Sequence, residues 1–249
     1  MNNKKMKIHD KIGKLKEITA NYNNIVFFGG AGVSTESGIP DFRSEKGIYE
    51  TIKKYEKHPE EILSHSYFIQ NTESFYKYYK EFMIHKDAKP NNAHIAIAKL
   101  EKEGKIKGVI SQNIDGLHQK AGSKNVLELH GSMERNYCMD CGEFYDIDHI
   151  LNSKNLPLCD CGGLIKPDVV LYQEPLNNET TSKSIELIVN ADVLIVGGTS
   201  LRVYPAAGLI EYYKGDKLIL INKSETSYDS YADLIINDNI GEVFKRVLS

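Results

Sequence analysis

Long hydrophobic runs are missing from this chain of 249 residues. No apolar stretch approaches the roughly 18 residues of a membrane-spanning helix, and residues 1–7 lead into an amphipathic segment without a signal-peptide core. A basic excess is missing as well, since the formal net charge is −3. These absences argue against membrane and nucleic-acid partners, and we expect a cytoplasmic protein.

Cysteine is scarce, with four residues, and in a cytoplasmic protein we do not expect them to form disulfides. Cys138 and Cys141 enclose two residues, Cys159 and Cys161 enclose one, and a 17-residue spacer separates the pairs. This spacing resembles a zinc ribbon, although two residues are usual within the second pair as well. Four thiolates close a tetrahedral site, so we expect one structural zinc; the alternative is four unligated cysteines.

Alternating strand and helix patterns fill most of the chain, which at 41% hydrophobic and 26% charged residues has an ordinary globular composition. Apolar runs predict strands at 25–28, 108–112, 126–129, 169–172, 192–200 (with a glycine-rich exit), 217–222 and 234–236. Helical spacing or helix-boundary residues predict helices at 8–22, 73–84, 91–104, 179–190, 205–215 and 241–248. The alternation predicts an α/β fold with a doubly wound parallel sheet.

A glycine-rich turn follows the first strand. Gly30 and Gly32 lack Cβ atoms, so a pyrophosphate can approach the backbone at a helix N-terminus. The dinucleotide fingerprint is partial, because Thr35 stands where a third glycine is expected and no acidic residue ends a second strand. The alternatives are a nucleotide cradle and an ordinary turn, and the group Asp41, Phe42 and Arg43 favours the cradle.

Polar residues follow other strands, at the sheet edge where open α/β sheets bind ligands. Asn113 and Asp115 flank Ile114 and are suited to a ribose or an amide, or to capping a turn. His130 is suited to general-base chemistry, although a lone histidine is more often a packing residue. Segment 198–200 is a second backbone cradle or a turn, and Asn222 binds ribose hydroxyls or caps a turn.

Taken together, these motifs resemble the sirtuins, in their bacterial form, a family of NAD-dependent protein lysine deacylases. The resemblance runs in order through nearly the whole chain and rests on residues 30–43, 112–118, 130–131, the four cysteines, 166–170 and 198–200. It implies a Rossmann-like NAD-binding domain in residues 1–44, 90–135 and 166–249. It also implies a helical insert with the cofactor loop at 45–89 and a zinc-binding module at 136–165.

The family's reaction follows from the resemblance. The acyl oxygen of a modified lysine attacks the ribose of the co-substrate NAD, nicotinamide leaves, and free lysine and O-acetyl-ADP-ribose are released. His130 is then the general base for a ribose hydroxyl, and Asn113 is a second catalytic residue. The implied NAD-binding residues are Gly30, Ala31, Gly32, Thr35, Asp41, Phe42, Arg43, Gln112, Asn113, Ile114, Asp115, His130, Gly198, Thr199, Ser200, Asn222 and Ile240.

The implied substrates are acyl-lysine proteins or peptides. The peptide adds an extended strand along Val169, Val170, Leu171 and Tyr172, and across the loop at 200–204. Family members that prefer succinyl-lysine carry a Tyr-x-x-Arg pair, and here Tyr79 stands in place of the arginine. An acetyl or longer apolar acyl group is therefore expected. Another departure is the segment Leu171-Tyr172-Gln173-Glu174, where Phe-Gly-Glu is commoner.

Three other functions compete with deacetylation. A nicotinamide-dependent dehydrogenase conflicts with the incomplete glycine fingerprint and with a structural zinc. A non-enzymatic alternative is a zinc-ribbon binding module for nucleic acid or protein, and the net charge of −3 argues against nucleic acid. Mono-ADP-ribosyl transfer uses the same NAD site and stays open. We expect a monomer.

Overall fold

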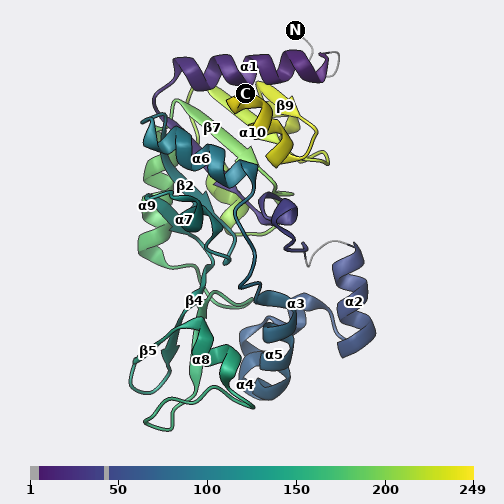
Figure 1. The fold of residues 1–249 in the computed structure, drawn as a ribbon, viewed down its shortest axis with the longest axis vertical. Helices are drawn as coiled ribbons and strands as arrows, with labels where there is room; N and C mark the ends of the chain where they lie inside the picture. The colour runs from purple at the N-terminus through teal and green to yellow at the C-terminus, as the bar shows by residue number, and fades with distance from the viewer. Residues whose placement is uncertain (1–5, 42–44) are drawn as a thin grey trace.

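The computed structural model describes residues 6–41 and 45–249, and Figure 1 shows a larger and a smaller part. The larger part is built on a parallel sheet with the order β3-β2-β1-β7-β8-β9. Its strands are β1 (Ile25–Gly29), β2 (Ile106–Ser111), β3 (Val126–Glu128), β7 (Val193–Gly197), β8 (Lys217–Ile221) and β9 (Leu234–Ile236). The order reverses between β1 and β7, so the predicted doubly wound fold is confirmed.

The central strands end at one level. Gly29 is in register with Ser111 of β2 and with Gly197 of β7. Every residue of β1 and β7 is buried, as expected for parallel strands that are covered on both faces. Because these strands finish together, the loops that follow them start side by side.

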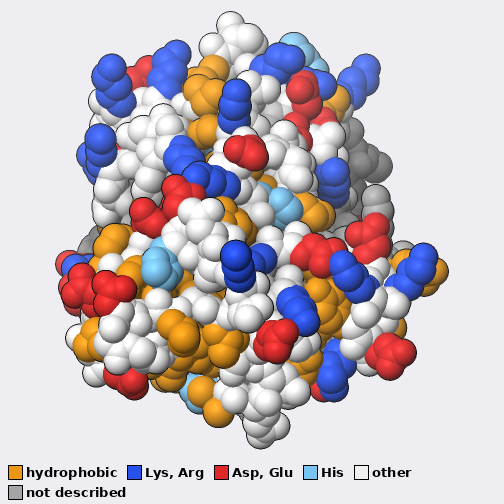
Figure 2. All heavy atoms as spheres, turned by 60° about the horizontal axis from the view of Figure 1, so that its bottom comes forward, with side chains coloured by type: hydrophobic (Ala, Val, Ile, Leu, Met, Phe, Trp, Pro, Cys, Tyr) orange, Lys and Arg blue, Asp and Glu red, His pale blue; other side chains and the backbone are white. Residues whose placement is uncertain are grey.

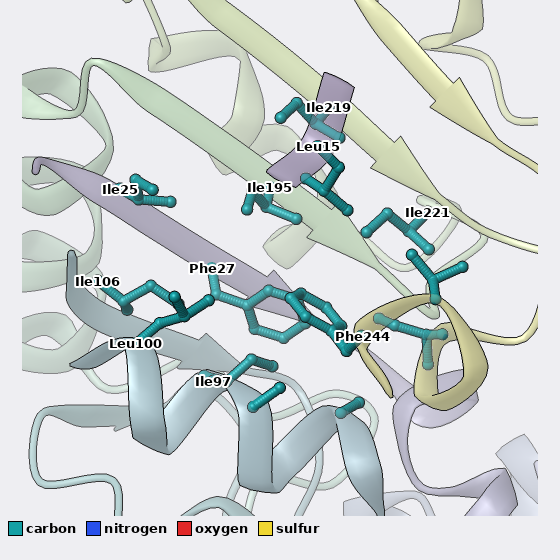
Figure 3. Close-up of a cluster of buried hydrophobic side chains, with 14 of the residues drawn as sticks. Leu15, Ile25, Phe27, Ile97, Leu100, Ile106, Ile195, Ile219, Ile221 and Phe244 are labelled. Carbon is teal, nitrogen blue, oxygen red and sulfur yellow. The ribbon is translucent and has the colours of Figure 1, made fainter. Parts of the chain in front are cut away.

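Helices cover both faces of the sheet. One face carries α1 (Ile8–Asn21), α6 (Asn92–Lys102) and α10 (Ile240–Leu248), whose apolar side chains meet those of the strands in the cluster of Figure 3. The other face carries α9 (Asn178–Asn190) and a 3₁₀ segment, Ala206–Tyr212. Ile25 and Phe27 point to the first cluster, and Val26 and Phe28 to the second, which is the two-residue period of a strand.

The smaller part contains an antiparallel sheet of order β5-β4-β6. Its strands are β4 (Gly131–Cys138), β5 (Phe144–Tyr145) and β6 (Ile165–Val169). Beside them lie α8 (Ile147–Asn152) and the insert helices α2 (Glu45–Tyr55), α3 (Pro59–Ile62), α4 (His65–Gln70) and α5 (Thr72–Tyr78), the last continuing as a π-helical turn, Tyr79–Met83.

One apolar cluster joins the helical insert to the cysteine-bearing module. Phe75 and Tyr76 of α5 belong to the same buried cluster as Ile147, Ile150 and Ile165. The core of the insert therefore packs against the module, and its expected place over the cofactor loop stays a prediction. The small sheet also extends beyond the span 136–165 at both ends, and the division into domains stays a prediction.

Several predicted elements differ in detail. The strand predicted at 169–172 is not part of the large sheet. The strand in this region is β6 (Ile165–Val169), which pairs with β4, and its alternating burial is typical of an antiparallel sheet that is covered on one face. Two 3₁₀ turns, Ala31–Val33 and Thr35–Ser37, replace the regular helix expected after the glycine turn. Gly38 ends the second turn in the left-handed conformation, with φ 84°, and Pro40 follows, so no longer helix forms.

Smaller differences concern two helices. The predicted helix 73–84 changes to π-helical geometry at Tyr79, and the predicted helix 205–215 is the 3₁₀ segment Ala206–Tyr212. Among the described residues, no helix is long and apolar enough to cross a bilayer.

Candidate active site

The glycine turn packs directly on the loop that follows β7. The Gly30 N–H donates to the Gly197 carbonyl at 3.1 Å, and the Gly32 N–H donates to the Gly198 carbonyl at 2.8 Å. A Cβ atom at Gly32 would lie 2.8 Å from the Cα of Gly198. The glycines are therefore required for the contact between two loops, and both N–H groups are engaged within the protein.

A buried carboxylate organises the neighbouring loop. Asp115, which is 7% exposed, accepts hydrogen bonds from the Ser34 hydroxyl at 2.6 Å and from the Leu117 N–H at 2.9 Å. The Asn113 amide donates to the same Ser34 hydroxyl at 3.1 Å and to the Gly30 carbonyl at 3.1 Å. Asn113 and Asp115 thus share one partner. Sequence reasoning missed Ser34, although it lies inside the motif that carries the resemblance.

His130 lies where the chain passes from β3 to β4. Its Nδ1 is 2.8 Å from the carbonyl oxygen of Gln112. A carbonyl only accepts hydrogen bonds, so Nδ1 carries the proton, and Nε2 is the basic nitrogen of the neutral ring. This tautomer is the one that a general base needs.

A cleft runs between the larger and the smaller part. It is lined by a set of predicted site residues, namely Ala31, Gln112, Asn113, Ile114, Asp115, His130, Val169, Val170, Leu171 and Tyr172. Sequence reasoning did not assign the apolar wall that the insert supplies, which consists of Leu63, Phe82 and Met83. The clue was available, because Phe82 and Met83 end the aromatic-rich helix that the sequence does predict.

Other predicted residues are not among those that line the cleft. Thr35 donates to the Gly32 carbonyl at 3.0 Å, and Thr199 accepts a hydrogen bond from the Gln112 amide at 3.2 Å. Asn222 donates to the Ser224 carbonyl at 3.1 Å, which is the turn contact that we considered as its alternative role. Ile240 is buried at the start of α10, where a Cβ added to Gly197 would meet it at 2.3 Å.

The four cysteines converge at the end of the smaller part. Their Sγ atoms all lie within 4.8 Å of one another, with Cys138–Cys161 and Cys141–Cys159 at 3.5 Å. All four are free thiols, and a tetrahedral zinc with Zn–S bonds near 2.3 Å separates its sulfurs by roughly 3.8 Å. The donor set fits one structural zinc. The Tyr145 hydroxyl donates to Cys159 at 3.2 Å and supports the site from outside.

Residues 30–205 match the model of the family described as Sir2 family. The chain belongs to the Sir2 family. The family expected from the motifs is thereby confirmed. The matched range contains the glycine turn, the Asp115 loop, His130 and the four cysteines.

Curated relatives of this Sir2 protein align along almost their whole length. A protein of Clostridium tetani named NAD-dependent protein deacetylase is 63% identical over 236 residues, which is 94% of this chain and 96% of that protein. One of Clostridium acetobutylicum with the same name is 59% identical over 245 residues, covering 98% of this chain and 100% of that protein.

Solved Sir2 structures are similar in fold. One, described as Sir2 with a p53 peptide and NAD⁺, has a TM-score of 0.85 and 39% identity, covering 98% of both chains. A Sir2 variant with a deacetylated p53 peptide and 3′-O-acetyl ADP-ribose has a TM-score of 0.87 and 40% identity, covering 95% of this chain and 97% of that chain.

The two tyrosines considered for acyl selectivity, Tyr76 and Tyr79, lie in the buried core of the smaller part of this Sir2 protein. Tyr76 donates to the Ile165 carbonyl, and the Tyr79 ring stacks on Phe75 with centroids 5.6 Å apart. Both side chains are fully buried, and burial raises the pKa of each phenol well above its usual range. Neither supplies a charge, and Phe82 and Met83 form the wall of the cleft on this side.

Two buried histidines lie beneath the Asp115 loop. Their rings, from His94 of α6 and His118 of α7 (Leu117–Ala121), are 4.7 Å apart, and the His94 Nδ1 accepts a hydrogen bond from the Asn91 N–H at 3.3 Å. Burial lowers the pKa of His94 to about 4 and holds the pKa of His118 well below its usual range. Both are neutral packing residues at neutral pH. Phe42 and Arg43, predicted to contact NAD, lie outside the described residues.

Proposed function

We propose that this Sir2 protein is an NAD-dependent protein lysine deacetylase. The observation that carries the proposal is the hydrogen bond from His130 to the Gln112 carbonyl, which prepares a basic Nε2 at the meeting point of both parts. The names of the curated relatives, and the Sir2 complexes with NAD⁺ and acetyl ADP-ribose, support the same activity.

NAD fits the loops that meet at the carboxyl ends of the central strands. Ala31, Gln112, Asn113 and Asp115 line the cleft there, and they offer amide and carboxylate groups to a ribose or a carboxamide. The predicted residues that do not line the cleft, including Gly198, Thr199 and Ser200, keep their assignment to the nucleotide as part of the proposal. Bound NAD supplies an electrophilic ribose carbon and a nicotinamide leaving group.

The protein's own residues then have separate tasks. His130 removes a proton from a ribose hydroxyl, while the Gln112 carbonyl keeps the ring in the required tautomer and orientation. Ser34 holds the Asp115 carboxylate and the Asn113 amide in place, so the polar groups are oriented before NAD arrives. The apolar wall excludes water from the acyl group.

The peptide is proposed to lie along residues 169–172, facing Val203 and Tyr204 across the cleft. In the structure, three N–H groups of this segment already have partners. Val170 donates to the His130 carbonyl, Leu171 donates to the Glu174 carboxylate, and Tyr172 donates to the Leu63 carbonyl. The carbonyls of Val169, Leu171 and Tyr172 also accept hydrogen bonds within the protein. Pairing with a substrate strand is therefore proposed to use the Val170 carbonyl, second lone pairs of the other carbonyls, or groups of the facing loop. Backbone pairing discriminates little between side chains, so broad sequence specificity is expected.

The substrate is proposed to be protein, not nucleic acid. On the face seen in Figure 2, the described Lys, Arg, Asp and Glu side chains are interspersed and do not form a basic stripe. Phosphate recognition depends on gathered positive charge, which this face does not offer. The monomeric state and the cytoplasmic location stay predictions from the sequence.

Mass spectrometry of the products tests the function. The protein is incubated with NAD and with peptides that carry acetyl-, propionyl-, succinyl- or long-chain acyl-lysine. We expect nicotinamide, free lysine and O-acetyl-ADP-ribose from the acetyl peptide and no desuccinylation, because the apolar wall offers a carboxylated chain no cation. Reduction of NAD by any substrate would instead support a dehydrogenase. Transfer of ADP-ribose to protein would support the third alternative.

A further inference from the structure

The active-site histidine lies at the junction of the two sheets. On the large-sheet side, the Leu129 N–H donates to the Ser111 carbonyl at 2.9 Å. On the small-sheet side, the Val170 N–H donates to the His130 carbonyl at 3.0 Å. The orientation of the imidazole therefore depends on how the two sheets are held relative to one another at this point.

The backbone ladder that joins β4 to β6 is interrupted beside this junction. Gly131 pairs with Val169, and the next paired residue of β4 is Asn136, which faces Pro167. The register is irregular between these two pairs, so residues 132–135 form no regular ladder pairing with β6. The antiparallel pairing alone does not make the junction rigid.

Arg135 bridges this interruption with its side chain. Its Nη1 donates to Glu128 Oε2 at 2.7 Å, and its Nε donates to Asp168 Oδ2 at 2.7 Å. Glu128 ends β3 of the large sheet, while Asp168 belongs to β6 of the small sheet. Each carboxylate lies two residues before one partner of the His130–Val170 hydrogen bond, so the guanidinium connects the two segments that meet at the histidine.

The Arg135–Glu128 contact differs from an ordinary surface ion pair because its carboxylate is largely buried, whereas the Asp168 side chain is 42% exposed. Both contacts of Arg135 are charge-assisted hydrogen bonds at short distance, and the planar guanidinium holds two carboxylates in a fixed geometry. The Glu128 side chain is 9% exposed and also accepts a hydrogen bond from the Gln119 amide of α7 at 2.8 Å. The bridge therefore extends to the helix that follows the Asp115 loop.

We propose that Arg135 is a positioning residue, which bridges the two sheets and thereby orients His130. The proposal rests on the proposed function for its catalytic consequence, but the bridge itself is a structural claim. Arg135 is not among the residues that line the cleft, so its effect on the reaction acts through His130.

The test compares Arg135→Met and Arg135→Lys with Lys183→Met, a control that removes an ion pair on α9, where Lys183 and Glu179 are 2.6 Å apart. We expect Arg135→Met to lower kcat by about tenfold or more and to leave the KM for NAD within about twofold, since a small misplacement of a reacting group is costly. Arg135→Lys keeps the positive charge but loses the planar guanidinium that contacts both carboxylates, so its kcat should lie between those of the wild type and Arg135→Met. Lys183→Met should match the wild type.

Amide hydrogen exchange provides a second readout that does not depend on activity. The Leu129 and Val170 N–H groups should exchange faster in Arg135→Met than in Lys183→Met, while the amides of β1 stay unchanged. Equal exchange in the two variants would overturn the bridge. Faster exchange with unchanged kcat would overturn the positioning role. A wild-type protein without deacetylase activity would refute the proposed function and leave the exchange test intact.

Discussion

The Nδ1 atom of His130 lies 2.8 Å from the carbonyl oxygen of Gln112, although the two residues come from different strand exits. Gln112 directly follows β2, and His130 follows β3, so the contact exists because these strands are parallel neighbours. The loop that we propose to contact NAD thus also sets the tautomer of the proposed base.

Ser34→Ala should destabilise the protein and reduce its activity. The hydroxyl is a 2.6 Å donor to the buried Asp115 carboxylate, and its loss leaves that oxygen without this partner. We expect a loss of about 1–3 kcal/mol in the free energy of unfolding, measured by urea denaturation, together with a lower kcat. Ser224→Ala is the control, because Ser224 is exposed and its contact with Asn222 uses the backbone carbonyl. Equal stability of the two variants would contradict the role of Ser34.

Removal of zinc should unfold the cysteine-bearing module. Its four ligands come from two short segments, the end of β4 with the turn after it and residues 159–161, and metal binding is coupled to the folding of such small units. After treatment with a chelator, the Gly142 and Gly162 amides, now hydrogen-bonded to the Cys138 and Cys159 carbonyls, should lose protection from exchange. Addition of zinc should restore it, and Cys141→Ser should behave like the zinc-free protein. Full protection without metal would show that the thiols alone hold the module.

Stability should fall in mild acid because of the buried histidines. The pKa of His94 is lowered to about 4 in the folded protein, against about 6.5 in an unfolded chain. Unfolding therefore takes up protons in this range, and the stabilisation, fully present above pH 6.5, is lost as the pH falls from about 6.5 to about 4. For His94 the loss amounts to about 3 kcal/mol.

Urea denaturation at several pH values checks this dependence. His94→Gln should reduce the slope of unfolding free energy against pH, whereas His9→Gln, at an exposed position on α1, should not. An unchanged slope in His94→Gln would show that other groups cause the acid sensitivity.

Gln173 should tolerate glycine but not valine. Its backbone has φ 76°, in the left-handed region, and its side chain accepts a hydrogen bond from the Ser66 N–H at 3.0 Å. Glycine removes a backbone cost of about 1–2 kcal/mol and loses a hydrogen bond worth about 1 kcal/mol, so the net change should be small. Gln173→Val loses the bond and keeps the strain, and it should unfold at a clearly lower urea concentration. Equal stability of both variants would contradict this account.

The sequence was most informative where a local pattern decides the structure. The continuous apolar character of Ile25–Gly29 and Val193–Gly197 marks strands that are buried on both faces, and the cysteine spacing marks a metal site before any contact is known. His130 could be singled out because it follows a strand.

Long-range contacts were not readable in this way. Ser34 and Asp115 are 81 residues apart, and no local pattern links them. The same holds for the core shared by the insert and the module, and for the approach of Gly32 to Gly198, which gives the glycines a packing role beside the proposed nucleotide role.

His130 is proposed to be the general base of an NAD-consuming deacetylation. The most direct measurement is mass spectrometry of the products that wild type and His130→Ala form from NAD and an acetyl-lysine peptide. We expect nicotinamide, deacetylated peptide and O-acetyl-ADP-ribose from the wild type, and a loss of about 100-fold or more in the acetyl-ADP-ribose product for the variant. Equal product formation by His130→Ala, or reduced NAD as a product of the wild type, would contradict it.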